Sequence, residues 1–401
     1  MRPFRRAKSR AVATNKKAGR THMDFAFTPA QEQVRETIIR FAQKHIAPRV
    51  REIEETETFP VDLFLKFADV GLMGIRYPEE DGGAGMDKVT DCIVREEMSR
   101  VCQSISAAWS AATHIGIWPI WRGGTDYQKE RWFSAALRGE AIAAFALSEP
   151  DGGSDTRALK TKAEKVPGGW KLNGAKLYIT NAPFANFLLL AARTKPELTS
   201  DAISLFIVDL PNPGIVIDKL DKEGIRASET GLVHIADAFV PDEALLGGKE
   251  GSYHLVMEAL AENRVGVSAN CLGMARNAYE VALDYAKTRL VRGKPIIEHQ
   301  AVAHRLADMA TDVETMRWMV YHGAWRVDQG TCDMALASKI KLHCSETAVR
   351  VTESAIRVLG GAGLMREYPV GRIHRDALVY LMGEGTSEIQ RNIISRTLKA
   401  E

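Results

Sequence analysis

The stretch from Tyr253 to Leu290, YHLVMEALAENRVGVSANCLGMARNAYEVALDYAKTRL, constrains the possible folds more than any other part of the chain. Its helical period predicts one long helix that is apolar over more than one face, and such a helix has to be covered on several sides. We therefore expect it to lie inside a helical bundle or an oligomer. Helical patterns over about 298–329 and 333–357, followed by a short last helix, complete the predicted bundle.

The N-terminal third of the chain also has a helical pattern, which runs from Thr28 to about residue 143. Its first helix is predicted to have Thr28 as its cap and Pro29 in its first turn. The apolar positions of this helix, spaced by three to five residues, are Val34, Ile38, Phe41 and Ile46.

Strand patterns replace the helical period near residue 145. Asn173 and Gly174 lie between two short β-rich runs and predict a hairpin, and FLLLAA, SLFIVDL and GIVIDKL are strand-sized apolar segments that follow. The expected fold class is therefore a multi-domain α+β protein. It has a helical N-terminal domain (23–143), a central antiparallel β domain (144–248) and a C-terminal helical bundle (249–401), preceded by a basic leader (1–22).

Charge is concentrated in that leader. The chain has 53 basic and 51 acidic side chains, but eight of the basic ones precede the first acid, Asp24, so the remaining body is mildly acidic. This balance gives no reason to expect nucleic acid as a partner. The leader, expected to be disordered, is either a transit peptide, which would place the protein in the mitochondrial matrix, or the product of a start upstream of Met23 in a cytoplasmic bacterial protein. No apolar run reaches the roughly 18 residues that would predict membrane insertion.

The five cysteines show no CxxC spacing and are odd in number. This pattern argues against a disulfide framework and against a zinc site. We expect no metal and a reducing compartment.

The segment LMGEGTSEIQ (381–390) places one carboxylate, Glu384, between two glycines and directly before a predicted helix. Ser387 followed by Gln390 resembles a capping box, so the helix is expected to begin near Ser387. The glycines make the turn flexible and leave the acid accessible. Glu384 is thus either a favourable charge near a helix N-terminus or a functional acid.

A second polar turn, LSEPDGGSD (147–155), opens the β domain. Ser148 and Ser154 flank a Pro-Asp-Gly-Gly turn whose amide groups have no neighbouring Cβ in the way. Such a turn either simply connects two strands or holds a planar or phosphate-bearing ligand.

The order and spacing of several motifs resemble the acyl-CoA dehydrogenase family from Asp24 to the C-terminus. They are LSEPDGGSD, YITNAPFAN, GIRASET, DAFVPDEALLG, RGKPIIEHQAVAHRLADMA, LGGAGLMREYPVGRIHRDA and GEGTSEIQ. The resemblance implies a C-terminal four-helix bundle, FAD as cofactor, a homotetramer, an acyl-CoA substrate and an electron-transfer flavoprotein as partner.

The same resemblance implies the site residues. Those expected around the flavin ring and its first phosphate are Phe145, Leu147, Ser148, Gly153, Ser154, Tyr178, Thr180 and Thr386. Those expected at the pyrophosphate and adenosine end, across a subunit interface, are Arg289, Arg292, Arg357, Gly360 and Gly361. Those expected to contact substrate are Ser154, Arg264, Gly385 and Trp109.

Some of these positions depart from the common family pattern. Tyr178 stands where Trp is frequent, Arg292 where Phe commonly precedes GKP, and Arg357 where Gln is usual. Two extra guanidinium groups would strengthen an anion contact, although Arg292 could equally point to solvent. Trp109 could close the acyl pocket or belong to the core.

The resemblance assigns Glu384 as the base that removes the α-proton of the thioester, while the flavin takes the β-hydride. Its own backbone N–H would help to bind the thioester carbonyl. Some family members carry the base directly before an Arg on the long helix, but here that position is Asn263, and Glu262 is one residue out of register. His114 is expected to be structural. An oxidase remains as an alternative on the same fold. Glu384 argues against a flavin monooxygenase, and the intact flavin loop and base argue against a non-catalytic flavoprotein.

Overall fold

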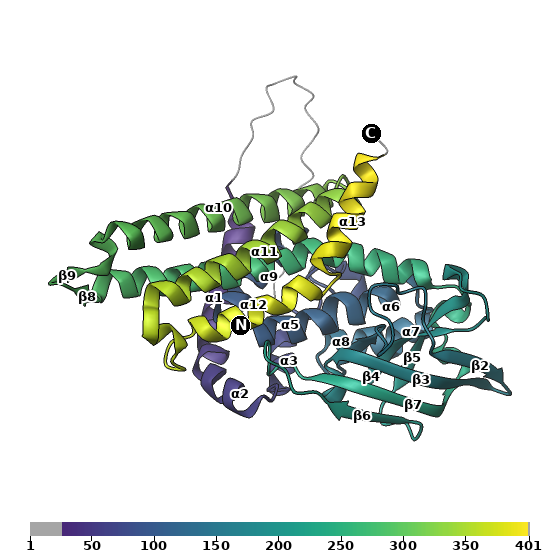
Figure 1. Ribbon diagram of the computed structural model, residues 1–401. Coiled ribbons are helices and arrows are strands. Elements are labelled where there is room, and N and C mark those ends of the chain that lie inside the picture. Colours follow the sequence, from purple (N-terminus) through teal and green to yellow (C-terminus); the bar gives the residue numbers. More distant parts are fainter. Residues whose placement is uncertain (1–25, 400–401) are drawn as a thin grey trace.

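A computed structural model describes residues 26–399, with helices first, then a sheet, then helices again (Figure 1). The predicted disorder of the leader lies outside the described residues. The N-terminal helices are α1 (Pro29–His45), α2 (Val50–Thr56), α3 (Asp62–Asp69), α4 (Lys88–Val101), α5 (Gln103–Ser110), α6 (Trp118–Gly123), α7 (Asp126–Gln128) and α8 (Ser134–Leu137). Between α5 and α6 runs a π-helical segment, η3 (Ala111–Gly116).

Helix α1 begins as the sequence predicts. The Thr28 side chain accepts a hydrogen bond from the backbone of Gln31, and the Gln31 side chain accepts one from the backbone of Thr28. This reciprocal pair satisfies two backbone donors at the start of the helix. The predicted apolar face, represented by Val34, Ile38 and Phe41, is buried.

The middle of the chain forms a seven-stranded sheet in the order β1-β4-β2-β3-β7-β6, with β5 paired to β4. Its strands are β1 (Ala143–Ala146), β2 (Lys162–Val166), β3 (Gly169–Thr180), β4 (Phe187–Arg193), β5 (Ile203–Asp209), β6 (Ile215–Lys219) and β7 (Thr230–Pro241). Most neighbours are antiparallel, as predicted, but β1 and the first residue of β2, Lys162, pair with β4 in parallel. Parallel pairing requires a long connection, and residues between β1 and β4 supply it.

The predicted hairpin at Asn173 and Gly174 is wrong. Both residues lie inside β3, where its register against β7 shifts, and the turn between β2 and β3 is at Gly168 instead. Asn173 exchanges two hydrogen bonds with Asp237 on β7, which holds this irregularity in place. A Cβ on Gly174 would lie 2.5 Å from the Thr161 hydroxyl, so glycine is required here for close packing.

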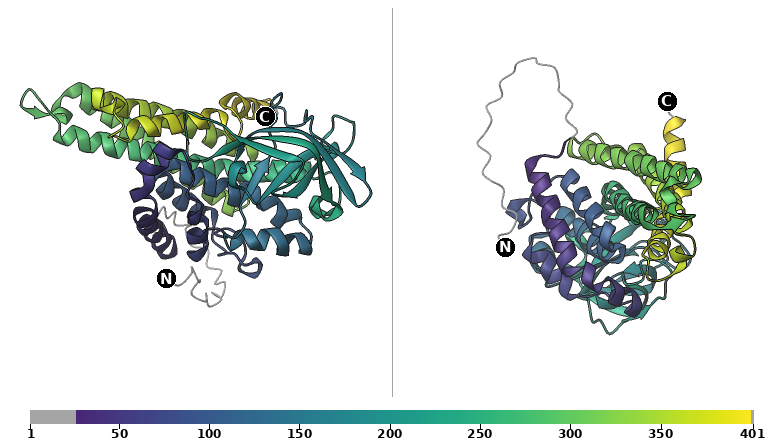
Figure 2. Two further views of the ribbon diagram at one scale, coloured as in Figure 1. Left: turned by 90° about the horizontal axis from the view of Figure 1, so that it is seen from below. Right: turned by 90° about the vertical axis from the view of Figure 1, so that its left-hand side faces the viewer.

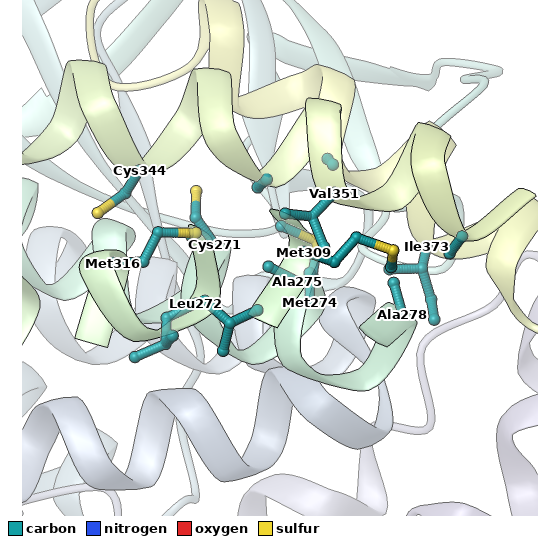
Figure 3. Close-up of a cluster of buried hydrophobic side chains, with 14 of the residues drawn as sticks. Cys271, Leu272, Met274, Ala275, Ala278, Met309, Met316, Cys344, Val351 and Ile373 are labelled. Atoms are coloured by element: carbon teal, nitrogen blue, oxygen red, sulfur yellow. The ribbon is translucent and has the colours of Figure 1, made fainter. Parts of the chain in front are cut away.

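The C-terminal bundle consists of α9 (Tyr253–Thr288), α10 (Gln300–Asp328), α11 (Met334–Leu359), α12 (Val370–Met382) and α13 (Ser387–Leu398). Figure 3 shows its core, where Cys271 and Met274 of α9, Met316 of α10, Val351 of α11 and Ile373 of α12 meet. Small residues along α9, such as Ala275 and Ala278, are fully buried. The prediction that α9 is covered on several faces is confirmed, since it packs against α4, α10 and α11.

The bundle projects away from the sheet, and the short strands β8 (Leu290–Val291) and β9 (Lys294–Pro295) form its far tip (Figure 2). Helix α9 is long enough to run from this tip to the N-terminal helices beside the sheet. No helix within residues 26–399 is long and apolar enough to cross a membrane.

Candidate active site

Glu384 lies in the turn between α12 and α13, as predicted, but the turn differs from the prediction in detail. Glu384 itself adopts a left-handed backbone (φ 59°), and so does Gly385 (φ 88°). Helix α13 begins at Ser387, yet its cap is Thr386, whose side chain accepts from the Ile389 backbone. The predicted Ser387 cap is therefore wrong. Ser387 is the first residue of the helix, and its side chain is buried, so the residue before it is the cap.

Two side chains fix the backbone of this turn from inside the molecule. The ammonium group of Lys341, on α11, donates to the carbonyl oxygens of Tyr380 (2.7 Å) and Gly385 (2.8 Å). Gln390 does not form the predicted capping box; its amide instead donates to the carbonyls of Glu384 and Gly385. A left-handed glutamate is unfavourable in isolation, so these contacts hold it in a conformation that aims its carboxyl group inward.

The two carboxyl oxygens of Glu384 have different surroundings. Oε1 accepts a hydrogen bond from Asn263 Nδ2 at 3.0 Å, whereas Oε2 is shielded from solvent and has no partner among the described residues. Burial raises the pKa of Glu384 above its ordinary value, against the opposing effects of the Asn263 hydrogen bond and the nearby cations Arg264, Arg95 and Lys341. A carboxylate with one unpaired, buried oxygen is suited to accept a proton.

Asn263 is held in turn by a buried chain of polar side chains. Arg95 Nη2 donates to Asn263 Oδ1 at 2.7 Å, and Arg95 Nε donates to Asp91 Oδ1 at 3.2 Å. Asp91 also contacts Lys88 Nζ (2.7 Å) and His114 Nε2 (2.7 Å). The side chains of Lys88, Asp91 and Arg95 are fully buried, so this network connects helix α4, through Asn263, to Glu384.

The charges in this network follow from their surroundings. Burial alone would raise the pKa of Asp91, but Arg95, His114 and Lys88 hold it well below its ordinary value. Burial and the neighbouring Arg95 lower the pKa of His114 to about 4, despite its contact with Asp91. The ring nitrogens of His114 contact Asp91 and the Thr113 hydroxyl, an arrangement compatible with the structural role expected for it.

A cavity of about 290 Å³ is lined in part by Asn263, and we call it the Arg76 cavity. Its walls come from the N-terminal domain and from α9. The lining residues are Met73, Ile75, Arg76, Tyr77, Lys88, Thr113, His114, Trp118, Trp121, Arg122, Ala259, Glu262 and Asn263. Because Asn263 also contacts Glu384, this one side chain links the cavity wall to Glu384.

Of the four residues expected to contact substrate, Arg264 and Gly385 are near this centre, Ser154 lies in the loop after β1, and Trp109 lies in the N-terminal core. Arg264 is buried and follows Asn263 on α9, and its guanidinium contacts the sulfur of Met334. Gly385 directly follows Glu384 in the chain. Trp109 is fully buried in the N-terminal core, donates to the Leu72 carbonyl, and is absent from the lining of the cavity. This placement favours the core alternative for Trp109.

The residues expected to surround the flavin form a shelf on strand β1, the loop that follows it, and the end of β3, in which Phe145 and Leu147 are buried and Gly153, Ser154 and Tyr178 are exposed. The members of this set are Phe145, Leu147, Ser148, Gly153, Ser154, Tyr178 and Thr180. A hydrogen bond from Leu177 N to Ser148 O (2.9 Å) ties the loop to β3. Glu149, which the sequence analysis missed, anchors the loop further by accepting from Lys160 N, Thr161 N and Lys176 Nζ.

This shelf fits a planar, phosphate-bearing group. An irregularity in β3 gives Tyr178 a left-handed backbone (φ 61°) and turns its ring outward, so that the residue is 70% exposed. A Cβ placed on Gly153 would meet no atom within 4 Å. An exposed phenol beside a loop with accessible amides is compatible with the flavin and first phosphate of FAD.

The remaining expected FAD residues lie elsewhere. Arg289 and Arg292 are exposed at the β8–β9 tip, and in Figure 1 this tip is at the opposite end of the molecule from β3. Arg357, Gly360 and Gly361 are exposed at the C-terminal end of α11, and Arg357 pairs with Glu353. Within one chain, these residues are therefore far from the shelf. The family resemblance implies that they would reach FAD bound to a neighbouring subunit.

The sequence analysis did not identify Lys88, Asp91, Arg95 or Arg76 as parts of the site. One signal was available: Lys88, Asp91 and Arg95 recur at spacings of three and four, so they share a face of one helix. That face would ordinarily be solvated, and the sequence contains no sign that α9 covers it. Arg76 lies in an irregular segment and shows no periodic signal.

The prediction of no metal is not contradicted. Within residues 26–399, no group of three or more His, Cys, Asp or Glu side chains is placed to bind a metal ion. All five cysteines are free thiols, and all but Cys332 are buried.

Three family models match nearly the whole chain. They are the acyl-CoA dehydrogenase N-terminal domain (residues 28–140), middle domain (144–238) and C-terminal domain (253–399). An acyl-CoA dehydrogenase of Bacillus subtilis is 39% identical over 92% of this chain and 98% of its own length.

Solved structures agree with these matches. The chain superimposes with a TM-score of 0.91 on a chain in the structure of the electron transferring flavoprotein of Acidaminococcus fermentans, with 34% identity over 94% of this chain and 100% of that one. It superimposes with a TM-score of 0.89 on a glutaryl-CoA dehydrogenase of Mycobacterium smegmatis in complex with FADH2, with 27% identity over 94% and 96% of the two chains.

Proposed function

The chain belongs to the acyl-CoA dehydrogenase family of flavoprotein oxidoreductases, and from that premise we propose that it converts an acyl-CoA thioester to the trans-2-enoyl-CoA with Glu384 as the base. The observation that carries this proposal is the buried, unpaired Oε2 of Glu384. Because no protein group in the described part of the chain donates a hydrogen bond to this oxygen, it is free to accept the α-proton of the substrate. The Asn263 hydrogen bond to Oε1 holds the carboxyl group in a fixed orientation during the transfer.

The raised pKa of Glu384 supports its role as a base. An ordinary glutamate, with a pKa of about 4.3, is a weak base near neutral pH. Burial raises the pKa of Glu384 and so makes its carboxylate more basic, while the nearby Arg264, Arg95 and Lys341 act in the opposite direction. The backbone N–H of Glu384 is proposed to donate to the thioester carbonyl and to stabilise the enolate-like transition state.

FAD is the proposed cofactor. The loop from Ser148 to Ser154, together with Tyr178 and Thr180, would hold the flavin ring and first phosphate, and Thr386 would lie on the phosphate side of the last turn. Arg289, Arg292, Arg357, Gly360 and Gly361 of a neighbouring subunit would hold the pyrophosphate and adenosine. When bound, FAD supplies the acceptor for the hydride that leaves Cβ. This chain's own residues supply the base, the oxyanion donor and the shielded site.

We propose a homotetramer and an electron-transfer flavoprotein as electron acceptor. The two sets of expected FAD-binding residues are far apart in one chain (Figure 1). Association of subunits would allow the two sets, from different subunits, to contact the same FAD. Large apolar side chains exposed at Trp325 (53%), Leu364 (73%) and Met365 (53%) are suited to such contacts. We also propose domain boundaries near residues 143 and 248.

Anaerobic titration of the purified protein with a panel of acyl-CoA thioesters tests this function. We expect a yellow protein with one FAD per chain, bleached by at least one saturated acyl-CoA, with the enoyl-CoA as product. A colourless protein that cannot be reconstituted with FAD would contradict the proposal. Reoxidation of the bleached flavin by oxygen faster than by an electron-transfer flavoprotein would identify an oxidase instead.

A further inference from the structure

The Arg76 cavity adjoins the proposed base through one residue of its wall. Asn263 forms part of its wall and is 3.0 Å from Glu384 through its hydrogen bond. A volume of about 290 Å³ is at the lower end of the range for ligand pockets. The cavity can therefore receive the distal part of an acyl group whose α-carbon faces Glu384.

Arg76 is the lining residue with unused hydrogen-bond donors. Its Nη2 pairs with Glu262 Oε1 at 2.9 Å, but its Nε and Nη1 are shielded from solvent and have no partner among the described residues. Buried donors in folded proteins are nearly always paired with protein, water or ligand. Two unused N–H groups on one guanidinium therefore indicate an acceptor atom that the protein itself does not provide.

Two other basic side chains of the lining, Lys88 and His114, are already engaged. Lys88 Nζ contacts Asp91, while the two ring nitrogens of His114 contact Asp91 and the Thr113 hydroxyl. Arg122, with a side chain 57% exposed, lies 3.7 Å from Glu258. Arg76 is thus the lining residue best placed to donate hydrogen bonds to a ligand in the cavity.

The rest of the wall suits hydrocarbon. Met73, Ile75, Trp118, Trp121 and Ala259 present apolar surface. The complementary occupant has a hydrocarbon segment along these residues and an oxygen at Arg76. A purely hydrocarbon chain would fill the cavity but leave the two Arg76 donors unpaired.

We propose that the cavity selects acyl groups that carry a hydrogen-bond-accepting oxygen in their distal half, with Arg76 as the specificity-determining residue. This inference rests on the proposed function. The accepting oxygen belongs to a neutral hydroxy or oxo group or to a carboxylate. Because Arg76 already has Glu262 as its counter-ion, a neutral oxygen satisfies the donors without placing a second negative charge beside Glu262.

Matched acyl-CoA series test the proposal on the FAD-bound enzyme. Each series has one chain length, from four to eight carbons, and ends in a methyl group, an alcohol or a carboxylate. The kcat/KM for flavin reduction is compared within each length. We expect an oxygen-bearing thioester to exceed its methyl counterpart by at least about tenfold at the best length, and the alcohol and carboxylate arms distinguish a neutral from an anionic acceptor.

Substitutions connect the preference to Arg76. Arg76→Met should reduce the ratio of kcat/KM for the oxygen-bearing and methyl-ended thioesters by at least about tenfold. Because this change leaves Glu262 without its partner, the double variant Arg76→Met, Glu262→Gln is measured in parallel. Arg51→Met is the matched control, since Arg51 is 90% exposed on α2 and pairs with Glu55 outside the cavity.

A binding measurement separates recognition from chemistry. The corresponding CoA thioethers lack the carbonyl that acidifies the α-proton, so they bind without reacting. Their Kd should show the same preference in the wild type, and the preference should disappear in both Arg76 variants. FAD content and thermal midpoint establish that the variants are folded.

The outcomes separate the two proposals. If the methyl-ended thioester reacts best at every length, or if both Arg76 variants keep the wild-type ratio within about threefold, the inference is wrong while the proposed function stands. If no thioester reduces the flavin of a folded, FAD-bound protein, the proposed function fails, and the selectivity proposal fails with it.

Discussion

Replacing Asn263 with leucine removes the side-chain donor to Glu384 Oε1 while keeping a side chain of similar shape. The 3.0 Å hydrogen bond favours the ionised carboxylate, so its loss raises the pKa of Glu384 further. A base acts only when it is deprotonated. The acidic limb of the pH–rate profile should therefore move to higher pH.

The size of the effect follows from the contact. A hydrogen bond to a charged group contributes about 1.5–3 kcal/mol, and about 1.4 kcal/mol corresponds to a factor of ten. The ratio of ionised to protonated Glu384 at a given pH should thus fall roughly 10- to 100-fold. We expect flavin reduction to fall by that factor on the acidic side of the profile and to recover toward the wild-type rate as the pH rises.

Rapid mixing with acyl-CoA at a series of pH values measures this shift. Asn392→Leu is the matched control, because Asn392 is exposed on α13. The Asn263 variant also leaves Arg95 Nη2 without its acceptor, so its thermal midpoint should fall. An equal loss of rate at every pH would refute the reasoning, since it would mean that Asn263 does not act on the ionisation of Glu384.

Three further changes test the supports of the site. A Cβ on Gly266 would lie 2.6 Å from the guanidinium carbon of Arg95, so Gly266→Ala should displace Arg95 and slow flavin reduction several-fold; an unchanged rate would show that Arg95 is not needed in its position. Lys341→Met removes a donor to Gly385 O and should slow flavin reduction with FAD content intact, whereas loss of FAD instead of rate would contradict this role. Arg357→Met should weaken FAD binding by about tenfold or more in equilibrium titration of the apoprotein, and an unchanged Kd would indicate that Arg357 remains solvated.

Much of the fold could be predicted because long amphipathic patterns determine long helices. The expected stretches 298–329 and 333–357 correspond to α10 (Gln300–Asp328) and α11 (Met334–Leu359). Errors arose where local signals competed with tertiary packing. Asn173 and Gly174 have the composition of a turn, but pairing of β3 with β7 across Asp237 keeps them within a strand.

The candidate site was only partly predictable for the same reason. Glu384 could be found because its neighbours form a local motif. Asn263, Arg95 and Arg76 could not be assigned partners, because their contacts join segments far apart in the chain, such as the 168 residues that separate Arg95 from Asn263. Only the packing of α4 on α9 converts a polar helix face into a buried network.

The central claim is that Glu384 removes the α-proton, and Glu384→Gln tests it most directly. Glutamine keeps the size of the side chain but cannot accept the proton as a base. A positioned base contributes about 10²- to 10⁴-fold, so flavin reduction on rapid mixing should slow by at least 100-fold while FAD and acyl-CoA still bind. Flavin reduction within about threefold of the wild-type rate would contradict the account and leave Glu384 as a charge near the start of α13, with Glu262 as the next acid to test.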